Sequence, residues 1–141
     1  MPRELSSNQL HWLAGLLEGE GYFGVVNNRV NGKVYRYPRI GVSMTDRDIV
    51  QRVAAVFGNS VYVVSVAKHP TSKLTQYRAY LIGSRAADLM RQILPIMGER
   101  RQERIRAVLT EWDARTPTQV RRRAACSVAA AGRNRSTSTG Q

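Results

Sequence analysis

The stretch LAGLLEGEG, from Leu13 to Gly21, places the carboxylates of Glu18 and Glu20 among three glycines, near the end of a predicted helix. Carboxylate oxygens bind hard divalent cations such as Mg²⁺, so acids at such a position are candidates for metal chemistry. The simpler alternative is a pair of solvated acids at a helix end. Glycine lowers helix propensity by about 1 kcal/mol, so its repeated use here calls for a packing reason.

A second set of candidate side chains alternates along the predicted strands. In KVYRYPRIGVSM, the residues Pro38, Ile40 and Val42 share one face, so the polar and aromatic residues between them point to the other. Arginine and glutamine can form bidentate hydrogen bonds with guanine and adenine, and basic residues at strand ends reach phosphates. An ordinary amphipathic sheet with solvated polar residues explains the pattern about as well. The predicted nucleic-acid contacts are Asn28, Arg29, Lys33, Tyr35, Tyr37, Arg39, Lys68, Lys73, Gln76, Arg78 and Tyr80.

The elements that must position these residues follow from hydrophobic periodicity and turn signals. Their order is helix, two strands, helix, two strands and two helices. This order predicts an α+β fold with a four-stranded, mostly antiparallel sheet, helices on one face and the other face open. The predicted ranges are helix 8–19, strands 22–28 and 33–44, helix 46–57, strands 60–68 and 74–83, and helices 85–97 and 99–112.

Single residues predict where several elements begin or end. Ser6 or Ser7 is expected to cap the first helix, Thr45 to open the second with a capping-box-like sequence, and Ser84 to cap the third. Pro38 lacks an amide hydrogen, so the second strand is expected at a sheet edge or with a bulge. The third strand is nearly all apolar, which leaves its register open.

The charge balance favours a polyanionic partner. The 141 residues contain 22 Lys and Arg against 10 Asp and Glu, a formal net charge of +12. Such an excess on a small chain most often serves nucleic-acid binding, although a solvated basic surface or a ribosome-associated extension is the alternative. The length predicts one domain, residues 1–113, followed by a tail, residues 114–141.

The tail differs in composition from the domain. From Arg115 onward there are six arginines and no acid, with Ser, Thr and Gly and little apolar bulk. We expect this segment to be disordered and to add phosphate contacts without choosing sequence.

The cysteine count and the absence of long apolar runs indicate the cellular compartment. The single cysteine, Cys126, excludes an intramolecular disulfide and fits a reducing environment. No signal peptide and no apolar run of membrane-spanning length is evident. We expect an intracellular protein, cytoplasmic or nucleoid-associated, with an organelle not excluded, and no membrane partner.

LAGLLEGEG resembles the LAGLIDADG motif of homing endonucleases at seven or more of its nine positions by residue class. The flanks in LHWLAGLLEGEGYF, the segment MTDRDIVQRVAAVFG and the pair Leu94–Pro95 are also similar to that family. The order of elements is that of the family's core unit, so the resemblance covers residues 6–112. The motif in this context is a specific signal.

The resemblance implies a metal-dependent phosphodiesterase. Glu20 holds the position of the family's catalytic carboxylate, and the carbonyl of Gly19 is a further expected contact to Mg²⁺ or another divalent cation such as Mn²⁺. Glu18 is expected to have a supporting role. Many relatives have Asp where Glu20 stands, which leaves rate and metal preference open.

Two further site positions depart from the family pattern or stay open. A basic residue near the scissile phosphate corresponds to Arg100 or Arg101, without a choice between them. Met44 stands where a polar residue often organises the attacking water, so Thr45 or Arg47 would have to serve.

One copy of the motif supplies half of an active site, so the resemblance implies a homodimer and a near-palindromic double-stranded DNA target. The glycines then have a packing reason, because Gly15 and Gly19 lie four residues apart and let two helices approach closely. The predicted dimer face is formed by Trp12, Gly15, Leu16 and Gly19.

The expected function is therefore that of a site-specific homing endonuclease making a double-strand cut. One alternative is a cleavage-inactive protein of the same fold, acting as a transcription regulator or as a maturase on its own intron RNA. A second is an unrelated basic RNA-binding or ribosome-associated protein, which predicts no role for Glu20.

Overall fold

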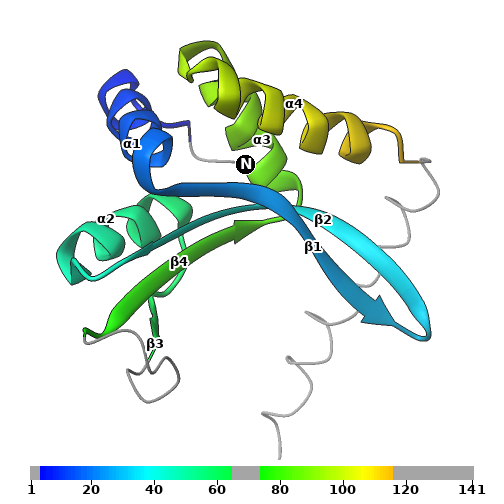
Figure 1. The fold of residues 1–141 in the computed structure, drawn as a ribbon, viewed down its shortest axis with the longest axis horizontal. Coiled ribbons are helices and arrows are strands. Elements are labelled where there is room, and N and C mark those ends of the chain that lie inside the picture. Colours follow the sequence, from blue (N-terminus) through cyan, green and yellow to red (C-terminus); the bar gives the residue numbers. More distant parts are fainter. Residues whose placement is uncertain (1–3, 65–73, 116–141) are drawn as a thin grey trace, which may run out of the picture.

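The computed structural model describes residues 4–64 and 74–115, and Figure 1 shows their arrangement. The predicted order of helices and strands and the α+β class are confirmed. The elements are α1 (Ser7–Glu20), β1 (Gly21–Val30), β2 (Lys33–Met44), α2 (Arg47–Phe57), β3 (Tyr62–Val64), β4 (Gln76–Ile82), α3 (Ser84–Ile93), a 3₁₀ turn (Leu94–Ile96) and α4 (Glu99–Asp113).

The sheet has the strand order β1-β2-β4-β3, and every neighbouring pair is antiparallel. Phe23, Ile40 and Leu81 are cross-strand partners in one row, and all three are buried. In the third strand, Tyr62 lies opposite Arg78, which settles the backbone register left open by the sequence. The remainder of the predicted third strand, residues 65–68, lies outside the described residues.

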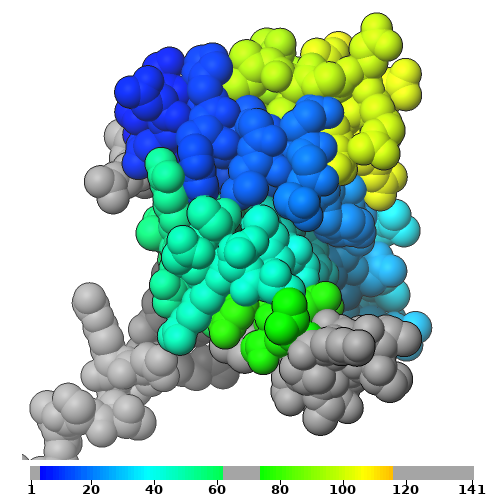
Figure 2. All heavy atoms as spheres, turned by 60° about the vertical axis from the view of Figure 1, so that its left-hand side comes forward, coloured from blue at the N-terminus to red at the C-terminus, as the bar shows by residue number. Residues whose placement is uncertain are grey.

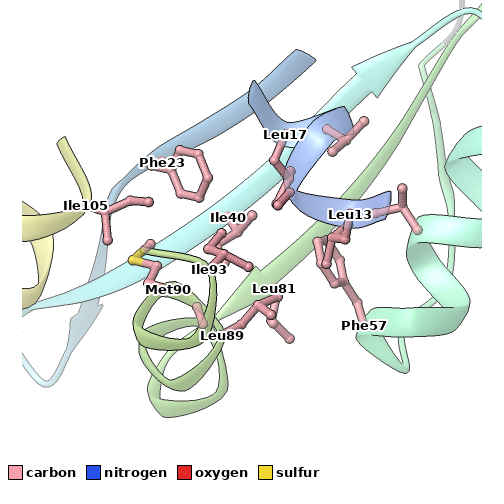
Figure 3. Close-up of a cluster of buried hydrophobic side chains, with 14 of the residues drawn as sticks. Leu13, Leu17, Phe23, Ile40, Phe57, Leu81, Leu89, Met90, Ile93 and Ile105 are labelled. Atoms are coloured by element: carbon pink, nitrogen blue, oxygen red, sulfur yellow. The ribbon is translucent and has the colours of Figure 1, made fainter. Parts of the chain in front are cut away.

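The core lies between the sheet and the helices. Figure 1 shows α1, α3 and α4 above the sheet and α2 at its left-hand end. In Figure 3, Leu13 and Leu17 of α1 point toward Ile40 of β2 and Ile93 of α3, and all four side chains are fully buried. The predicted inward positions of β2 are confirmed, and its opposite face remains open to carry the predicted polar residues.

The prediction that Pro38 places β2 at a sheet edge or in a bulge is wrong, because the register with β1 runs through Pro38 without interruption. β2 is an inner strand that pairs with β1 from Lys33 to Val42 but with β4 only from Arg39 to Met44. The carbonyl of Pro38 accepts a hydrogen bond from Gly83 N at 2.9 Å, so its ring nitrogen also faces the side where β4 ends. The missing amide hydrogen therefore interrupts no ladder bond.

Two predicted caps are also wrong, whereas Ser6 caps α1 as expected, in a capping box with Gln9. The second helix begins one residue later than Thr45 would allow, with Asp46 at the N-cap and no side-chain cap bond. The cap of α3 is Gly83, not Ser84. Gly83 has φ +84°, a conformation that favours glycine, and this turns the chain directly from β4 into α3.

The long helix predicted for residues 85–97 is shorter than expected. It ends at Ile93, and the chain continues as a 3₁₀ turn that contains Pro95, because proline disrupts a helix interior.

Within the described residues, no helix is both long and apolar enough to span a bilayer.

Candidate nucleic-acid interface

Glu20 is the last residue of α1, and its side chain is exposed at the point where the helix meets the sheet. It lines a shallow hollow of about 320 Å³ on the open face of the sheet. The hollow combines one carboxylate with two guanidinium groups and two phenol rings. Its lining residues are Glu20, Tyr22, Arg39, Gly41, Val42, Ser43, Arg78 and Tyr80.

Two rings define the walls of this hollow. Tyr22, Gly41 and Tyr80 are cross-strand partners on β1, β2 and β4. A Cβ added at Gly41 would lie 3.0 Å from the Tyr80 ring, so glycine lets that ring lie flat over β2. The phenol group of Tyr22 covers Gly24 in the same way, because a Cβ added there would overlap it.

Arg39 is held between these rings. Its guanidinium carbon lies 3.7 Å from the Tyr80 ring centroid and 5.9 Å from that of Tyr22. Its Nε is buried and has no hydrogen-bond acceptor among the described residues. Because the guanidinium plane is already oriented, binding a ligand would cost little side-chain entropy.

The predicted contacts of β4 lie on the same face. Arg78 Nε lies 3.3 Å from Ser43 Oγ, and Ser43 Oγ lies 3.4 Å from Gln76 Oε1. The alternation argument missed Ser43 as a site residue, although it follows Arg39 and Gly41 at the same two-residue spacing. The sequence predicts Thr45 or Arg47 as the polar residue near the end of β2 that would organise water. Ser43 is also a polar residue at that end, while Met44 packs partly against the core.

The remaining predicted contacts lie on the β1–β2 hairpin, which extends beyond β4 (Figure 1). Asn28, Arg29 and Lys33 are exposed, and Tyr35 is half-buried opposite Asn28. Lys68 and Lys73 lie outside the described residues.

Tyr37, predicted as a nucleic-acid contact, also contacts the end of α4, which the sequence did not reveal. Its ring centroid lies 6.3 Å from that of Trp112, at the end of α4. The guanidinium of Arg115 lies 5.2 Å from the Tyr37 ring and 4.3 Å from the Trp112 ring. Arg115 was assigned to the tail, but it packs on the domain.

The two arginines proposed for the scissile phosphate differ in environment. Arg100 is exposed. Arg101 is half-buried and donates hydrogen bonds to the carbonyls of Glu18 and Gly21. The Glu18 carboxylate accepts a hydrogen bond from Gly98 N at 3.0 Å, which gives it a structural contact at the start of α4.

The predicted dimer face lies on the outer side of α1, which Figure 2 shows in dark blue at the surface. Gly15 and Gly19 are exposed, and a Cβ added to either would meet nothing within 4 Å. The Arg52 guanidinium lies 3.9 Å from the Trp12 ring, and Leu16 packs partly against the core. Nothing in the described chain explains these glycines.

A metal at this site needs more ligands than one chain supplies. Among the described residues, no three His, Cys, Asp or Glu side chains gather into a metal-binding group. The exposed Glu20 carboxylate at the end of a helix suits a cation, because the C-terminal end of a helix carries partial negative charge. The described residues therefore fit part of a divalent-cation site, which further oxygen ligands would have to complete.

Comparison with known proteins identifies the fold. No family model and no curated protein matches the chain. Among solved structures, the homing endonuclease I-CvuI, in complex with its target and calcium, matches with a TM-score of 0.55 at 15% identity, over 73% of this chain and 64% of that one. The intron-encoded homing endonuclease I-CeuI, complexed with DNA, gives 0.53 at 14% identity, over 78% and 57%.

The LAGLIDADG homing endonuclease I-GzeII, in complex with its DNA target, gives 0.51 at 10% identity, over 74% of this chain and 36% of that one. The chain thus spans less than two thirds of the length of each of these three structures. These matches show that the protein has the fold of the LAGLIDADG homing endonucleases.

Proposed function

We propose that this protein is a site-specific DNA endonuclease that makes a metal-dependent double-strand cut as a homodimer. The observation that carries the proposal is the position of Glu20. The motif carboxylate stands at the foot of a helix whose outer glycines have open space around them within the described chain. It opens onto a sheet face that carries two arginines and two tyrosines. The DNA complexes of the structural neighbours support this assignment.

Duplex DNA would lie along the open face of the sheet. Arg39, Gln76 and Arg78 would offer hydrogen bonds to base edges, with Arg39 oriented in advance by the Tyr80 ring. Asn28, Arg29 and Lys33 on the long hairpin would reach more distant positions of each half-site. The net charge of +12 favours association with the phosphate backbone.

The Glu20 carboxylate and the Gly19 carbonyl would hold Mg²⁺ or Mn²⁺ together with phosphate oxygens. The cation, when bound, activates water and stabilises the leaving oxygen. The exposed Arg100, at the start of α4, would place its guanidinium against the scissile phosphate. A second chain would bring a second Glu20, so each protomer would serve one strand and the target would be near-palindromic.

The test is a cleavage assay on a randomised duplex library and on genomic DNA flanking the gene, with and without Mg²⁺ or Mn²⁺. Wild type should cut a defined site, and Glu20→Gln should bind the same site without cutting it. Glu103→Gln, which removes an exposed acid on α4, is the matched control and should cut normally. Full cutting by Glu20→Gln removes Glu20 from the mechanism, and specific binding without cutting by wild type identifies a cleavage-inactive binding protein.

A further inference from the structure

Arg101 joins the start of α4 to the end of the motif helix. Its Nε and Nη2 donate to the carbonyl of Glu18 at 3.2 and 3.0 Å, and its Nη1 donates to the carbonyl of Gly21 at 2.8 Å. Each of the three guanidinium nitrogens therefore has a main-chain acceptor. The two carbonyls lie on either side of Gly19 and Glu20, the two residues of the proposed cation site.

A second contact runs in the opposite direction. The Glu18 carboxylate accepts a hydrogen bond from the amide of Gly98, the N-cap of α4. A Cβ at Gly98 would lie 2.9 Å from Glu18 Oε1, so glycine permits this close approach. The acid also lies at the positive end of the α4 dipole, where a carboxylate is stabilised.

The end of α1 needs such support. The last carbonyls of a helix lack intrahelical donors, and the glycines at positions 15 and 19 weaken the last turns. At the C-cap, the amide of Gly21 donates a hydrogen bond to the carbonyl of Leu17. Without an external donor, the turn that carries Glu20 would fray.

We propose that Arg101 is a positioning residue, which fixes the carbonyls of Glu18 and Gly21 and thereby holds Gly19 and Glu20 in the geometry that binds a divalent cation. Each of its three guanidinium nitrogens is bonded to a main-chain carbonyl, so we assign the contact with the scissile phosphate to the exposed Arg100 instead. The consequence for the cation rests on the proposed function. The restraint on residues 19–21 does not, and this allows the two to be tested separately.

The experiment compares Arg101→Gln and Arg101→Lys with Arg104→Gln in the full chain. Arg104 is the matched control, because its Nε also donates to a β1 carbonyl, that of Phe23, at 2.9 Å, but farther along the chain from Glu20. The first readout is amide hydrogen exchange at residues 19–21. Arg101→Gln should accelerate exchange at Gly21, while Arg104→Gln should leave it unchanged.

The second readout is Tb³⁺ binding by luminescence, with Glu20→Gln defining the part that depends on Glu20. Arg101→Gln should weaken this binding by roughly tenfold, the size of effect seen when groups that orient metal ligands are removed. The Mg²⁺ concentration for half-maximal cleavage should rise by a similar factor, with unchanged DNA affinity in Ca²⁺. Arg101→Lys keeps the positive charge and is therefore the variant more tolerated by the fold. It should show the same changes in exchange and in Tb³⁺ binding to a smaller degree.

Unchanged exchange and unchanged Tb³⁺ binding in a folded Arg101 variant would overturn the inference. Loss of DNA affinity with a normal metal response would overturn it as well, because it would make Arg101 a phosphate contact. A wild type that binds Tb³⁺ through Glu20 but does not cut DNA would reject the proposed function alone. A wild type without Glu20-dependent Tb³⁺ binding would reject the proposed function and the consequence of Arg101 for the cation, while amide exchange at Gly21 would still decide the restraint on residues 19–21.

Discussion

Arg39 is the side chain on the open face whose chemistry is most constrained by its neighbours. It stacks on Tyr80, and its buried Nε has no acceptor among the described residues. A buried donor without a partner costs about 1–3 kcal/mol, so Arg39 is held in this position at a cost in stability. Stacking fixes the plane of the guanidinium, which bidentate recognition of a base requires.

Arg39→Lys should therefore relax the choice of base at one position of each half-site. Lysine keeps the charge but loses the planar fork, and one bidentate contact is worth about 1–3 kcal/mol of discrimination. Sequencing the products cut from a randomised duplex library would measure this preference. Arg106→Lys, on the exposed side of α4, should leave it unchanged, and an unaltered preference in Arg39→Lys would exclude Arg39 from base recognition.

Among the elements, the β1–β2 hairpin is the one that most needs bracing. Between Pro38 and the turn, the hairpin consists of two strands within the described part of the chain. An isolated two-stranded ribbon is marginally stable. The end of α4 supports it through the Arg36–Glu111 ion pair and the contact of Trp112 with Tyr37. The position of the hairpin residues that are predicted to contact DNA thus depends on a helix on the other side of the sheet.

The two parts of this brace should differ in strength. Trp112→Ala removes a partly buried ring and should lower the free energy of unfolding by about 2 kcal/mol. Glu111→Gln breaks an ion pair between side chains that are 53% and 42% exposed, and should cost less than about 1 kcal/mol. Urea unfolding measures both, and a larger loss for Glu111→Gln would assign the brace to the ion pair.

How far the sequence predicts the structure differs between elements. Alternation identified the buried face of β2 and the open-face residues Gln76, Arg78 and Tyr80, because burial has a two-residue period in strands. Alternation could not predict the contacts that Arg101 and Tyr37 make within the fold, because their partners lie at least 75 residues away in the chain. The error at Pro38 has a similar cause. Whether its missing amide hydrogen interrupts a ladder hydrogen bond depends on where β4 ends, and β4 is distant in the sequence.

For the whole molecule, assembly is the property on which cleavage would depend. One chain offers one motif carboxylate, and the outer side of α1 carries glycines that contact nothing within the described chain. Close helix packing would account for them, since a small residue lets two backbones approach. A second copy of this chain, packed α1 against α1, would bring the two Glu20 side chains toward each other.

Gly15→Leu should prevent this assembly without unfolding the chain. A Cβ at Gly15 meets nothing within 4 Å, and replacing a helical glycine should stabilise the monomer by a few tenths of a kcal/mol to about 1 kcal/mol. Between two closely packed helices, the same side chain would clash. Sedimentation equilibrium should therefore show a dimer for wild type and a monomer of equal or higher melting temperature for the variant.

The matched control is Ala55→Leu, which places the same side chain on the exposed surface of α2, and it should remain dimeric. Gly15→Leu leaves Glu20 in place, so the monomer should retain the sheet surface for a half-site while losing double-strand cleavage. A Gly15→Leu protein that still sediments as a dimer would move the interface away from α1. A monomeric wild type that cuts both strands would show that one chain can complete the site, and would leave the glycines without a packing reason.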